Sequence, residues 1–512
     1  MVKAKKEKKV ASKKKVEKEL KTKKSSSTAK EKKATKKEKA VEPVAPSYSM
    51  NALLDYMTKS ADVVEKEENL TANINDSYRL STGLLVLDML LDGGICSSWY
   101  SVSGEEASWK TGSAITMVKA AADNQVPLIY YMDAENALKT KAVKATFKTD
   151  NADNVFGKRD EKGTYLTRPL VRYSDDQRLE KVFTVLKKTL LRLPDKQQSA
   201  ITGKWYYVFD RTKDDKKKWE AMGLSNPDKK LFTLTGSYWF EAPDDNLQFF
   251  AVIDSLPALV PEVSAENEDG TDNSIALLAR CLAKWIPQVK GLLKRKHAAI
   301  LVVNQIRAKP LVMYGPTEGE PGGNAAKFFS DYRLKFAPKA IPTPAWDRQK
   351  GNSYICEEPS VEGPGKDYYM MKSVKVLKTK TDAAGQSSVV RIWCKDCNGK
   401  YRASDPVFDA WQVLSTLNLV SGNRKKEFTI DLKCCEGIKF DWNMFKLCIL
   451  TEVKKSKELW KKLQTEYKVK FTKPLKIRKA LSDIIKAGNL EQYMNRKSNE
   501  EAETALSLED DE

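Results

Sequence analysis

The stretch SGEEASWKTG, residues 103–112, constrains the fold more than any other part of the chain. Gly104, Lys110 and Thr111 match the phosphate-binding pattern G-x-x-x-x-G-K-[ST], but Trp109 stands where the second glycine belongs. A strand-like run precedes the stretch and a helix-like segment follows it, which is the context that such a loop requires. The sequence therefore predicts a nucleotide site, with Trp109 a costly residue if its backbone needs a positive φ.

Three further strand-like runs each end in polar residues. Because ligand groups lie at the carboxyl ends of strands in a parallel sheet, these residues are expected to collect beside the phosphate loop. An α/β fold with a mostly parallel central sheet is therefore predicted. The runs and their ends are PLIYYMDAEN with Asp133 and Glu135, FFAVIDS with Asp254 and Ser255, and AAILVVNQIR with Asn304 and Gln305.

The chemistry of these side chains indicates a site for ATP and Mg²⁺. Lys110 would neutralise the β- and γ-phosphates, and the Thr111 hydroxyl would ligate Mg²⁺. Asp254 would hold the same ion through water, although a strand-end turn residue is the simpler alternative. Glu135 would orient the attacking water, with an N-cap for the next helix as its alternative. Gln305 would sense the γ-phosphate or, alternatively, merely end a strand.

Both ends of the chain carry unbalanced charge. Lys and Arg number 89 against 69 Asp and Glu, and the 18 Lys and 6 Glu of residues 1–42 supply most of the excess. We expect residues 1–46 to be disordered, because so few apolar groups cannot bury enough surface. Such a tail would grip phosphates or simply keep the protein in solution. Residues 498–512 are predicted to form an acidic tail.

Composition also excludes several classes of protein. Eight cysteines in 512 residues do not indicate a disulfide scaffold, and we expect reduced thiols in a cytoplasmic setting. No apolar run approaches the ~20 residues of a membrane helix, and no secretory or mitochondrial leader is expected. The only histidine, His297, is interpreted as structural. Cys394 and Cys397 form C-x-x-C, but the adjacent pair Cys434–Cys435 argues against a zinc site.

Several blocks, in collinear order over about residues 80–395, resemble the RecA family of strand-exchange recombinases. They are STGLLVLDMLLDGGI, DAENAL, VIDSLPALVPE, NQIRAKPLVMYGPTEGEPGGNAAKFF and VKVLKTKTDAAGQ. The aromatic Trp109 is similar to the residue at this loop position in phage recombinases of the UvsX type. The stretch DPVFDAWQVLSTLNLV and the acidic tail also resemble that branch.

The resemblance implies a RecA-like P-loop ATPase core with a smaller C-terminal domain. Residues 47–80 would form an N-terminal helix and linking segment for polymerisation. The core would span 81–395, with 194–246 as an inserted aromatic and charged subdomain. Residues 396–497 would form a C-terminal DNA-binding or accessory domain.

The resemblance also implies roles for particular residues in the ATP site. Lys378 and Lys380, which alternate along a strand and so share a face, would reach the ATP of a neighbouring subunit; the alternative is one exposed basic face. Lys139 and Ala142 depart from the family's aspartate and tyrosine near the adenine, and Asn136 replaces its usual histidine. The loop residues that would cradle the phosphates are Gly104, Glu105, Glu106, Ala107, Ser108, Trp109, Lys110, Thr111 and Gly112.

The predicted DNA contacts lie in two loops and one helix. The loop over 307–323 combines basic, apolar and glycine residues, which suits wedging between bases while holding the backbone; a flexible surface loop is the alternative. The loop over 262–273 is acidic, which argues against such a role. The candidate residues are Arg307 and Lys309 for phosphates, Met313 and Tyr314 as wedge, Gly322, Gly323 and Asn324 for close approach, and Arg280 on the preceding helix.

The expected function is therefore that of a DNA-dependent ATPase which forms helical filaments on single-stranded DNA and exchanges strands with homologous duplex DNA. Single-strand-binding and loading proteins are further candidate partners, and no membrane is involved. A phage origin would place the protein in the cytoplasm of an infected bacterial host. The alternatives are a RecA-fold helicase or motor and a non-hydrolysing DNA-coating protein. A third alternative is that only the lysine-rich tail binds DNA.

Overall fold

The computed structural model describes much of the chain from residue 78 onward. The described residues are 78–198, 202–209, 238–242, 245–262, 273–308, 318–338, 355–380, 384–393, 403–467, 473–488, 490 and 493. The predicted tails, the C-x-x-C pair and most of the segment 47–80 lie outside these ranges. None of the described helices is long and apolar enough to cross a membrane.

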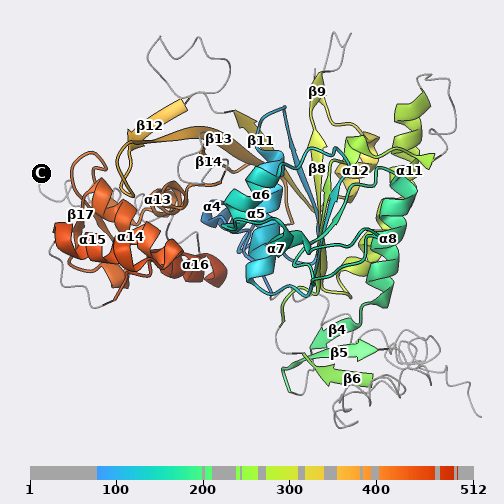
Figure 1. Ribbon diagram of the computed structural model, residues 1–512, viewed down its shortest axis with the longest axis horizontal. Helices are drawn as coiled ribbons and strands as arrows, with labels where there is room; N and C mark the ends of the chain where they lie inside the picture. Colours follow the sequence, from blue (N-terminus) through green and yellow to red (C-terminus); the bar gives the residue numbers. More distant parts are fainter. Residues whose placement is uncertain are drawn as a thin grey trace, which may run out of the picture. The chain divides into compact units, whose positions relative to one another are not determined.

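A nine-stranded mixed sheet forms the centre of the fold (Figure 1). Its order is β12-β13-β11-β1-β8-β7-β2-β3, with β14 paired to β13. The six strands from β11 to β3 are mutually parallel, whereas β13 runs antiparallel to its neighbours β11, β12 and β14. The predicted α/β class with a mostly parallel sheet is thus confirmed. The bounds are Trp99–Gly104 for β1, Leu128–Asp133 for β2, Arg172–Ser174 for β3, Phe249–Asp254 for β7, Ala298–Gln305 for β8, Tyr332–Pro338 for β11, Ile355–Pro359 for β12, Lys366–Lys378 for β13 and Ser387–Trp393 for β14.

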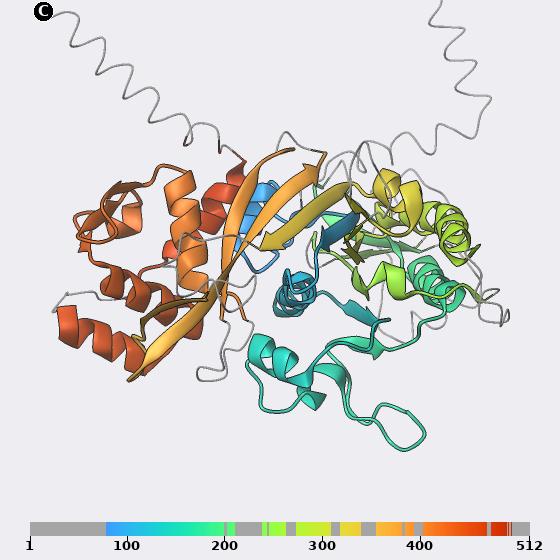
Figure 2. The same ribbon diagram turned by 90° about the horizontal axis from the view of Figure 1, so that it is seen from above.

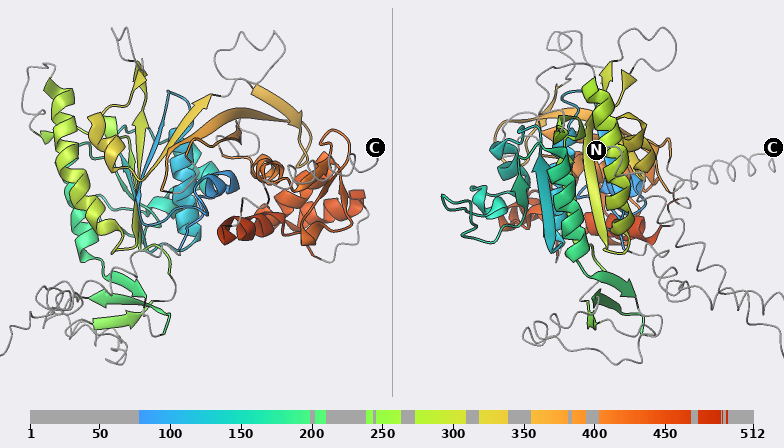
Figure 3. Two further views of the ribbon diagram at one scale, coloured as in Figure 1. Left: turned by 180° about the vertical axis from the view of Figure 1, so that it is seen from behind. Right: turned by 90° about the vertical axis from the view of Figure 1, so that its right-hand side faces the viewer.

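The strands β1, β7 and β8 at the centre of the sheet are buried along almost their whole length because helices cover both of their faces. Alternate residues of β7 enter different layers: Phe249 packs with Phe183 and Leu282, while Phe250 packs with Ile115 on the opposite face. Figure 3 accordingly shows α8 and α11 together on one side of the sheet and α5 on the other. The bounds are Leu85–Leu90 for α4, Lys110–Asp123 for α5, Thr140–Phe147 for α6, Asp153–Phe156 for α7, Leu179–Arg192 for α8, Asn273–Leu293 for α11 and Gly323–Phe329 for α12.

The register aligns the carboxyl ends of the central strands. Gly104 at the end of β1 is paired with Gln305 at the end of β8. Asp133 at the end of β2 is paired with Asp254 at the end of β7. Short elements follow these ends, namely the 3₁₀ helix η2 over Leu256–Ala258 and the two-residue strands β9, Arg307–Ala308, and β10, Glu318–Gly319. The polar strand ends therefore meet at one edge, as the sequence predicts.

One long helix expected from the sequence begins later than its pattern indicates. The stretch 171–193 reads as a single helix, but β3 occupies its start and α8 begins only at Leu179. The carboxylate of Asp176 accepts the backbone N–H of Arg178 at 3.0 Å, which fixes a turn between the two elements. This local hydrogen bond competes with helical pairing, as aspartate commonly does before a helix.

The segment 194–246 contributes a three-stranded antiparallel sheet, β4-β5-β6. Its strands are Asp195–Gln198, Trp205–Phe209 and Tyr238–Glu241. The buried ammonium of Lys196 donates to the Asn246 carbonyl at 2.8 Å, and the Lys196 backbone N–H donates to the Arg295 carbonyl just before β8. The small sheet is therefore joined to the amino end of β8, opposite the phosphate loop.

His297 lies at this junction between the small sheet and the core. Its ring meets Trp205 edge-on at 4.7 Å between centroids. Burial, followed by the nearby Lys196 charge, lowers the pKa of His297 to about 4. The imidazole is therefore neutral at pH 7, which agrees with the structural interpretation of this residue.

The segment after residue 403 packs around an aromatic cluster that includes Trp411, Phe428 and Phe445. Figure 2 shows β13 and β14 running side by side toward its helices. The sequence patterns of 405–420 and 456–471 predict helices, and α13 and α15 lie within these stretches. The bounds are Pro406–Thr416 for α13, Val420–Gly422 for β15, Phe428–Ile430 for β16, Lys433–Cys435 for the 3₁₀ helix η4, Lys439–Phe440 for β17, Trp442–Lys454 for α14, Lys457–Tyr467 for α15 and Ile477–Ala487 for α16.

One buried carboxylate, Asp409 of α13, connects this segment to α4 in the core. It accepts the backbone N–H groups of Leu85 and Val86 at 2.9 and 3.0 Å, at the first turn of α4. Arg478 of α16 pairs with the same carboxylate at 2.8 Å. The Asp409 carboxylate thus accepts two N–H groups at the start of α4 and neutralises the Arg478 guanidinium.

Asp409→Ala should destabilise the protein by about 3 kcal/mol, because it leaves two buried N–H groups and a guanidinium without their acceptor. Denaturant unfolding followed by tryptophan fluorescence would measure the loss. Asp405→Asn is not a suitable control because Asp405 is itself paired with Arg391. The exposed Asp483→Ala of α16 is suitable, and an equal effect of both variants would contradict the role given to Asp409.

Candidate nucleotide site

The phosphate loop joins the end of β1 to the start of α5, as the strand–loop–helix pattern predicts. Gly104 ends the strand and Lys110 begins the helix, so the first backbone N–H groups of a 14-residue helix face the loop. Helix N-termini favour anions through these N–H groups and the helix dipole. The loop geometry therefore fits a phosphate chain.

Trp109 adopts the left-handed backbone that the phosphate pattern normally assigns to glycine. Its φ is +76° and its ψ is +23°. The indole is only 7% exposed and meets Phe336 of β11 edge-on, with 6.2 Å between ring centroids. The unfavourable backbone conformation is thus accompanied by burial of a large apolar group.

Gly112 makes room for this indole. A Cβ at position 112 would lie 2.0 Å from the Trp109 Nε1 and 2.3 Å from its Cδ1, which no packed structure tolerates. Tryptophan at 109 therefore requires glycine at 112. Sequence reasoning placed Gly112 among the loop residues but did not find this dependence, because it arises from side-chain packing.

Lys110 stands at the mouth of the loop. Its ammonium donates to the carbonyls of Gly104 and Glu105 at 3.0 and 2.5 Å. Burial lowers the pKa of Lys110, while the nearby carboxylates of Glu135 and Asp254 act in the opposite direction. The cation is thus positioned within the loop, where it can exchange its carbonyl partners for phosphate oxygens.

Glu135 and Gln305 are in direct contact. The Gln305 side-chain amide donates to Glu135 Oε1 at 2.6 Å, and the Ser255 hydroxyl donates to the same oxygen. These groups follow three different strands, β2, β8 and β7, and meet because the strand ends are aligned. Ser255 was noted in the sequence only as a polar strand end, and its contact with Glu135 makes it a positioning residue.

Asp254 is a deeply buried carboxylate of the site, at 3% exposure. The Tyr131 hydroxyl donates to it at 2.7 Å, and the Thr111 hydroxyl also donates to it. Burial raises the pKa of Asp254 to about 6; the two hydroxyls oppose this rise and the charges of Glu135 and Asp133 add to it. A carboxylate that is costly to ionise gains from a nearby cation.

These oxygens fit a hydrated Mg²⁺ ion. Thr111 and Asp254 place a hydroxyl and a carboxylate together beside Lys110, and Mg²⁺ prefers hard oxygen ligands with several retained waters. Asp133, by contrast, accepts the backbone N–H groups of Ala137 and Leu138 at 3.1 and 3.0 Å. It therefore has a structural role at the start of the next turn.

A cavity of about 500 Å³ connects these groups. Its lining includes the loop from Glu106 to Gly112, together with Glu135, Asp254 and Gln305. This volume is typical of small-molecule sites. Lys139 and Ala142, which depart from the family pattern near the adenine, also line the cavity.

Asp254→Asn should stabilise the nucleotide-free protein at neutral pH. A folded pKa of about 6, above the ordinary 3.8, means that the carboxylate costs stability at pH values above 3.8, with the full cost reached above about 6. The cost disappears as the pH falls toward the unfolded pKa, so the advantage of the variant should be about 3 kcal/mol at pH 7.5 and small at pH 4.5. Urea unfolding at the two pH values measures this difference. A variant less stable than the wild type at pH 7.5 would contradict it.

The candidate DNA residues are only partly described. Lys309, Met313 and Tyr314 lie outside the described ranges. Arg307 lines the nucleotide cavity, two residues after Gln305, so it stands closer to the phosphate loop than the sequence suggested. Its strand β9 pairs with β10, so these two strands lie at the two ends of the segment 309–317 of the candidate DNA loop.

Gly322 and Gly323 lie where α12 meets α11. Both have positive φ, +91° and +68°, and a Cβ at 323 would lie 3.0 Å from the Ala279 Cβ. The glycines are therefore needed for backbone conformation and for the close approach of the two helices. Asn324 and Arg280 are both exposed near this contact.

Lys378 and Lys380 lie away from the nucleotide cavity of their own chain. Lys378 donates to the Phe328 carbonyl at 2.9 Å, and Lys380 pairs with Asp331 at 3.0 Å. Asp331 also pairs with Lys290 at 2.8 Å. The side chain of Phe328 beside them is 74% exposed, which is unusual for a large apolar group.

The segment 246–344 matches the family model of the RecA N-terminal domain. Similar proteins include "Protein RecA" of Aquifex pyrophilus, 43% identical over 84 residues, which are 16% of this chain and 24% of the relative. The RecA protein of Borrelia hermsii is 40% identical over 84 residues, 16% of this chain and 23% of its own length. That of Thermus aquaticus is 41% identical over 91 residues, 18% and 26% respectively.

These matches support the RecA family. The chain spans about a quarter of the length of the curated relatives it matches. The matched segment contains β7, η2, α11, β8 and α12, and with them Asp254 and Gln305. Glu135 and the phosphate loop lie before it, so their assignment rests on the geometry described above.

No group of three His, Cys, Asp or Glu side chains able to hold a metal ion occurs among the described residues. Cys434 and Cys435 have their sulfur atoms 3.7 Å apart and are free thiols. Cys394 and Cys397 fall outside the described ranges.

Proposed function

We propose that this protein is a DNA-dependent ATPase that forms helical filaments on single-stranded DNA and catalyses homologous pairing and strand exchange. The contact between Gln305 and Glu135 carries the proposal. The contact joins Glu135, the candidate for orienting the attacking water, to the end of β8. This strand leads directly into the candidate DNA loop. Occupancy of the ATP site and the conformation of that loop would thus depend on the same pair.

In the ATP site each side chain would take one task. Lys110 would leave its two loop carbonyls for the β- and γ-phosphates, and Thr111 with Asp254 would hold hydrated Mg²⁺. Glu135 would orient the attacking water, while Ser255 keeps its carboxylate in place. The metal would supply charge stabilisation for the transferring phosphoryl group.

Coupling to DNA would run through β8. Gln305 would exchange Glu135 for the γ-phosphate, and a shift at this position would reach Arg307 two residues later. Because β9 is paired with β10, the shift would also reach the glycines at the start of α12. ATP would therefore favour the DNA-binding form of the loop, and hydrolysis would release it.

Filament formation would bring a second copy to the face that carries Phe328, Lys378 and Lys380. An exposed phenylalanine beside two cations suits a protein contact with an anionic ligand at its edge. On this proposal the lysines complete the ATP site of the neighbouring subunit. The likeness of Trp109 to the residue at this position in UvsX-type phage recombinases belongs to the same proposal, as does a bacterial host cytoplasm.

Strand exchange between circular single-stranded DNA and homologous linear duplex tests the proposal. ATP-dependent joint molecules and nicked circles are the expected products. Duplex unwinding without exchange would favour a RecA-fold helicase. DNA binding with neither activity would favour a non-hydrolysing coating protein. A heterologous duplex of equal length is the control.

A further inference from the structure

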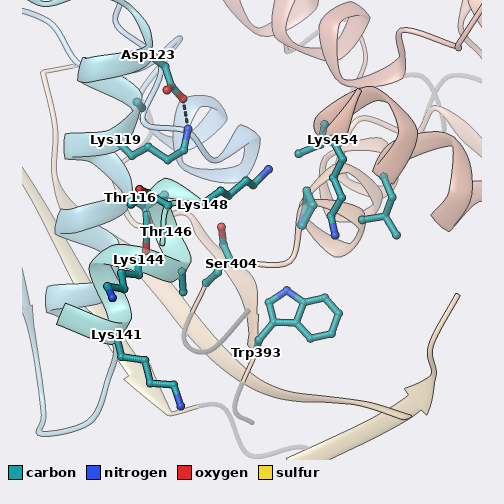
Figure 4. A pocket seen from close by; sticks show the side chains of 18 of the residues that line it. Thr116, Lys119, Asp123, Lys141, Lys144, Thr146, Lys148, Trp393, Ser404 and Lys454 are labelled. Atoms are coloured by element: carbon teal, nitrogen blue, oxygen red, sulfur yellow. Dashed lines mark hydrogen bonds and ion pairs between the residues drawn. The ribbon is translucent and has the colours of Figure 1, made fainter. Parts of the chain in front are cut away.

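A second cavity, of about 700 Å³, lies between the core and the C-terminal helices. One wall is formed by α5, α6 and the residues after α6, and the other by α14, α16 and residues 403–406 (Figure 4). Thr146 alone lines both this cavity and the nucleotide cavity, so the two are neighbours separated by α6.

The lining of this cavity is strongly cationic. Six cationic side chains face it, against the acidic side chains of Asp123 and Asp150 alone. They come from two regions that are more than 300 residues apart in the sequence. One region contains α5, α6 and the end of α6, and the other contains α14 and α16. The six are Lys119, Lys141, Lys144, Lys148, Lys454 and Arg478.

Carboxylates neutralise only part of this charge. Three of the cations have ion pairs, Lys119 with Asp123, Lys454 with Glu362 and Arg478 with Asp409. Lys144 and Lys148 form no ion pair with the described residues. Figure 4 shows Lys148 extending across the cavity in the direction of Lys454.

The cations are close enough to disfavour one another. Partial burial lowers the pKa of Lys148, and the charges of Lys119, Lys454 and Arg478 lower it further, against Asp123. Partial burial also lowers the pKa of Lys454. The fold holds these charges together although their mutual repulsion destabilises the free protein. Lys141, Lys148 and Lys454 are exposed, so an anion can reach this cluster, and shifted pKa values of this kind are frequent at functional sites.

The remaining lining suits a compact ligand. Thr146 and Ser404 supply hydroxyls, and the indole of Trp393 forms part of the opposite wall. The volume lies within the range of small-molecule sites. A nucleic-acid duplex spreads its phosphates along a wide convex surface, whereas these cations converge on one cavity from several elements.

We propose that this cavity binds a small, multiply phosphorylated ligand at a site separate from the phosphate loop. The bound ligand would join α5 to α14 and α16. Because α5 begins at Lys110, such a ligand would link the C-terminal helices to the helix that carries the nucleotide site. The proposal does not depend on recombinase activity, since it concerns a different set of residues.

The test is a calorimetric titration of inorganic tripolyphosphate into the full chain carrying Lys110→Ala, which weakens the phosphate-loop site. One binding event is expected to remain. Adding Lys148→Glu should weaken it at least tenfold, because a charge-assisted contact becomes a repulsion. Lys457→Glu is the matched control, since it makes the same charge change on an exposed residue outside the cavity, and it should change the affinity less than twofold.

A second variant separates charge from folding. Lys148 has a φ of +54°, so Lys148→Asn removes the charge while keeping a residue that tolerates this conformation. It should weaken tripolyphosphate binding several-fold with an unchanged melting temperature. Absence of binding in the Lys110→Ala protein would overturn the proposal, as would equal losses in the Lys148 and Lys457 variants. If Lys148→Glu weakens duplex DNA binding but not tripolyphosphate binding, the cavity is a DNA contact instead and the proposal fails.

Discussion

Glu135→Gln should lower the rate of ATP hydrolysis by about 10²–10⁴-fold, the usual contribution of a positioned general base. The substitution is conservative, because an amide oxygen can still accept from Gln305 and Ser255, as Glu135 Oε1 does now. ATP affinity should therefore change little. Single-turnover hydrolysis, together with binding of a fluorescent ATP analogue, separates the two quantities.

The control for this experiment is Glu161→Gln, which changes an exposed carboxylate outside the nucleotide cavity. This variant should hydrolyse ATP at the wild-type rate. Hydrolysis by Glu135→Gln within a few-fold of the wild type would show that the carboxylate only shapes the turn after β2. That outcome would leave Glu135 a structural role, although not that of a helix cap, because the N-cap position of α6 is Lys139.

Gly112→Ala should disrupt the phosphate loop. Its Cβ would overlap the rigid, buried indole of Trp109, so the loop or the start of α5 must move. Overpacking of this kind costs about 1–3 kcal/mol. Because the displaced groups are those that face phosphate, ATP affinity should fall at least tenfold. Equilibrium binding of ATP with Mg²⁺ measures the effect.

The double variant Trp109→Gly with Gly112→Ala tests the cause. Glycine at 109 adopts the positive φ freely and removes the indole from position 112, so ATP binding should recover most of the loss. Trp109→Gly alone should bind ATP but be less stable, because it opens a cavity beside Phe336. If the double variant binds ATP as weakly as Gly112→Ala alone, the dependence of Trp109 on Gly112 is wrong.

The sequence predicts the parts of the site that follow from strand order. Glu135, Asp254 and Gln305 end apolar runs, and parallel pairing brings such ends to one edge. The registers Gly104–Gln305 and Asp133–Asp254 have this arrangement. Neither result requires side-chain detail, which is why the α/β class and the position of the site could be expected from the pattern alone.

Other features depend on three-dimensional packing and could not be expected. The fit of Trp109 over Gly112 arises from side-chain direction, and the start of α8 is set by the Asp176 side chain rather than by periodicity. The cationic cavity joins Lys148 to Lys454, which are distant in sequence. Lys378 and Lys380 were expected from resemblance, and their place beside the exposed Phe328 became visible only in the fold.

The central claim is that DNA binding and ATP hydrolysis are coupled in this chain. The most direct test is the steady-state ATPase rate of the purified full chain with and without single-stranded DNA. The account predicts slow hydrolysis alone and at least tenfold stimulation by DNA, which corresponds to about 1.4 kcal/mol in the activation free energy. Hydrolysis that is absent in both conditions, or equally fast in both, while single-stranded DNA is bound, would contradict it.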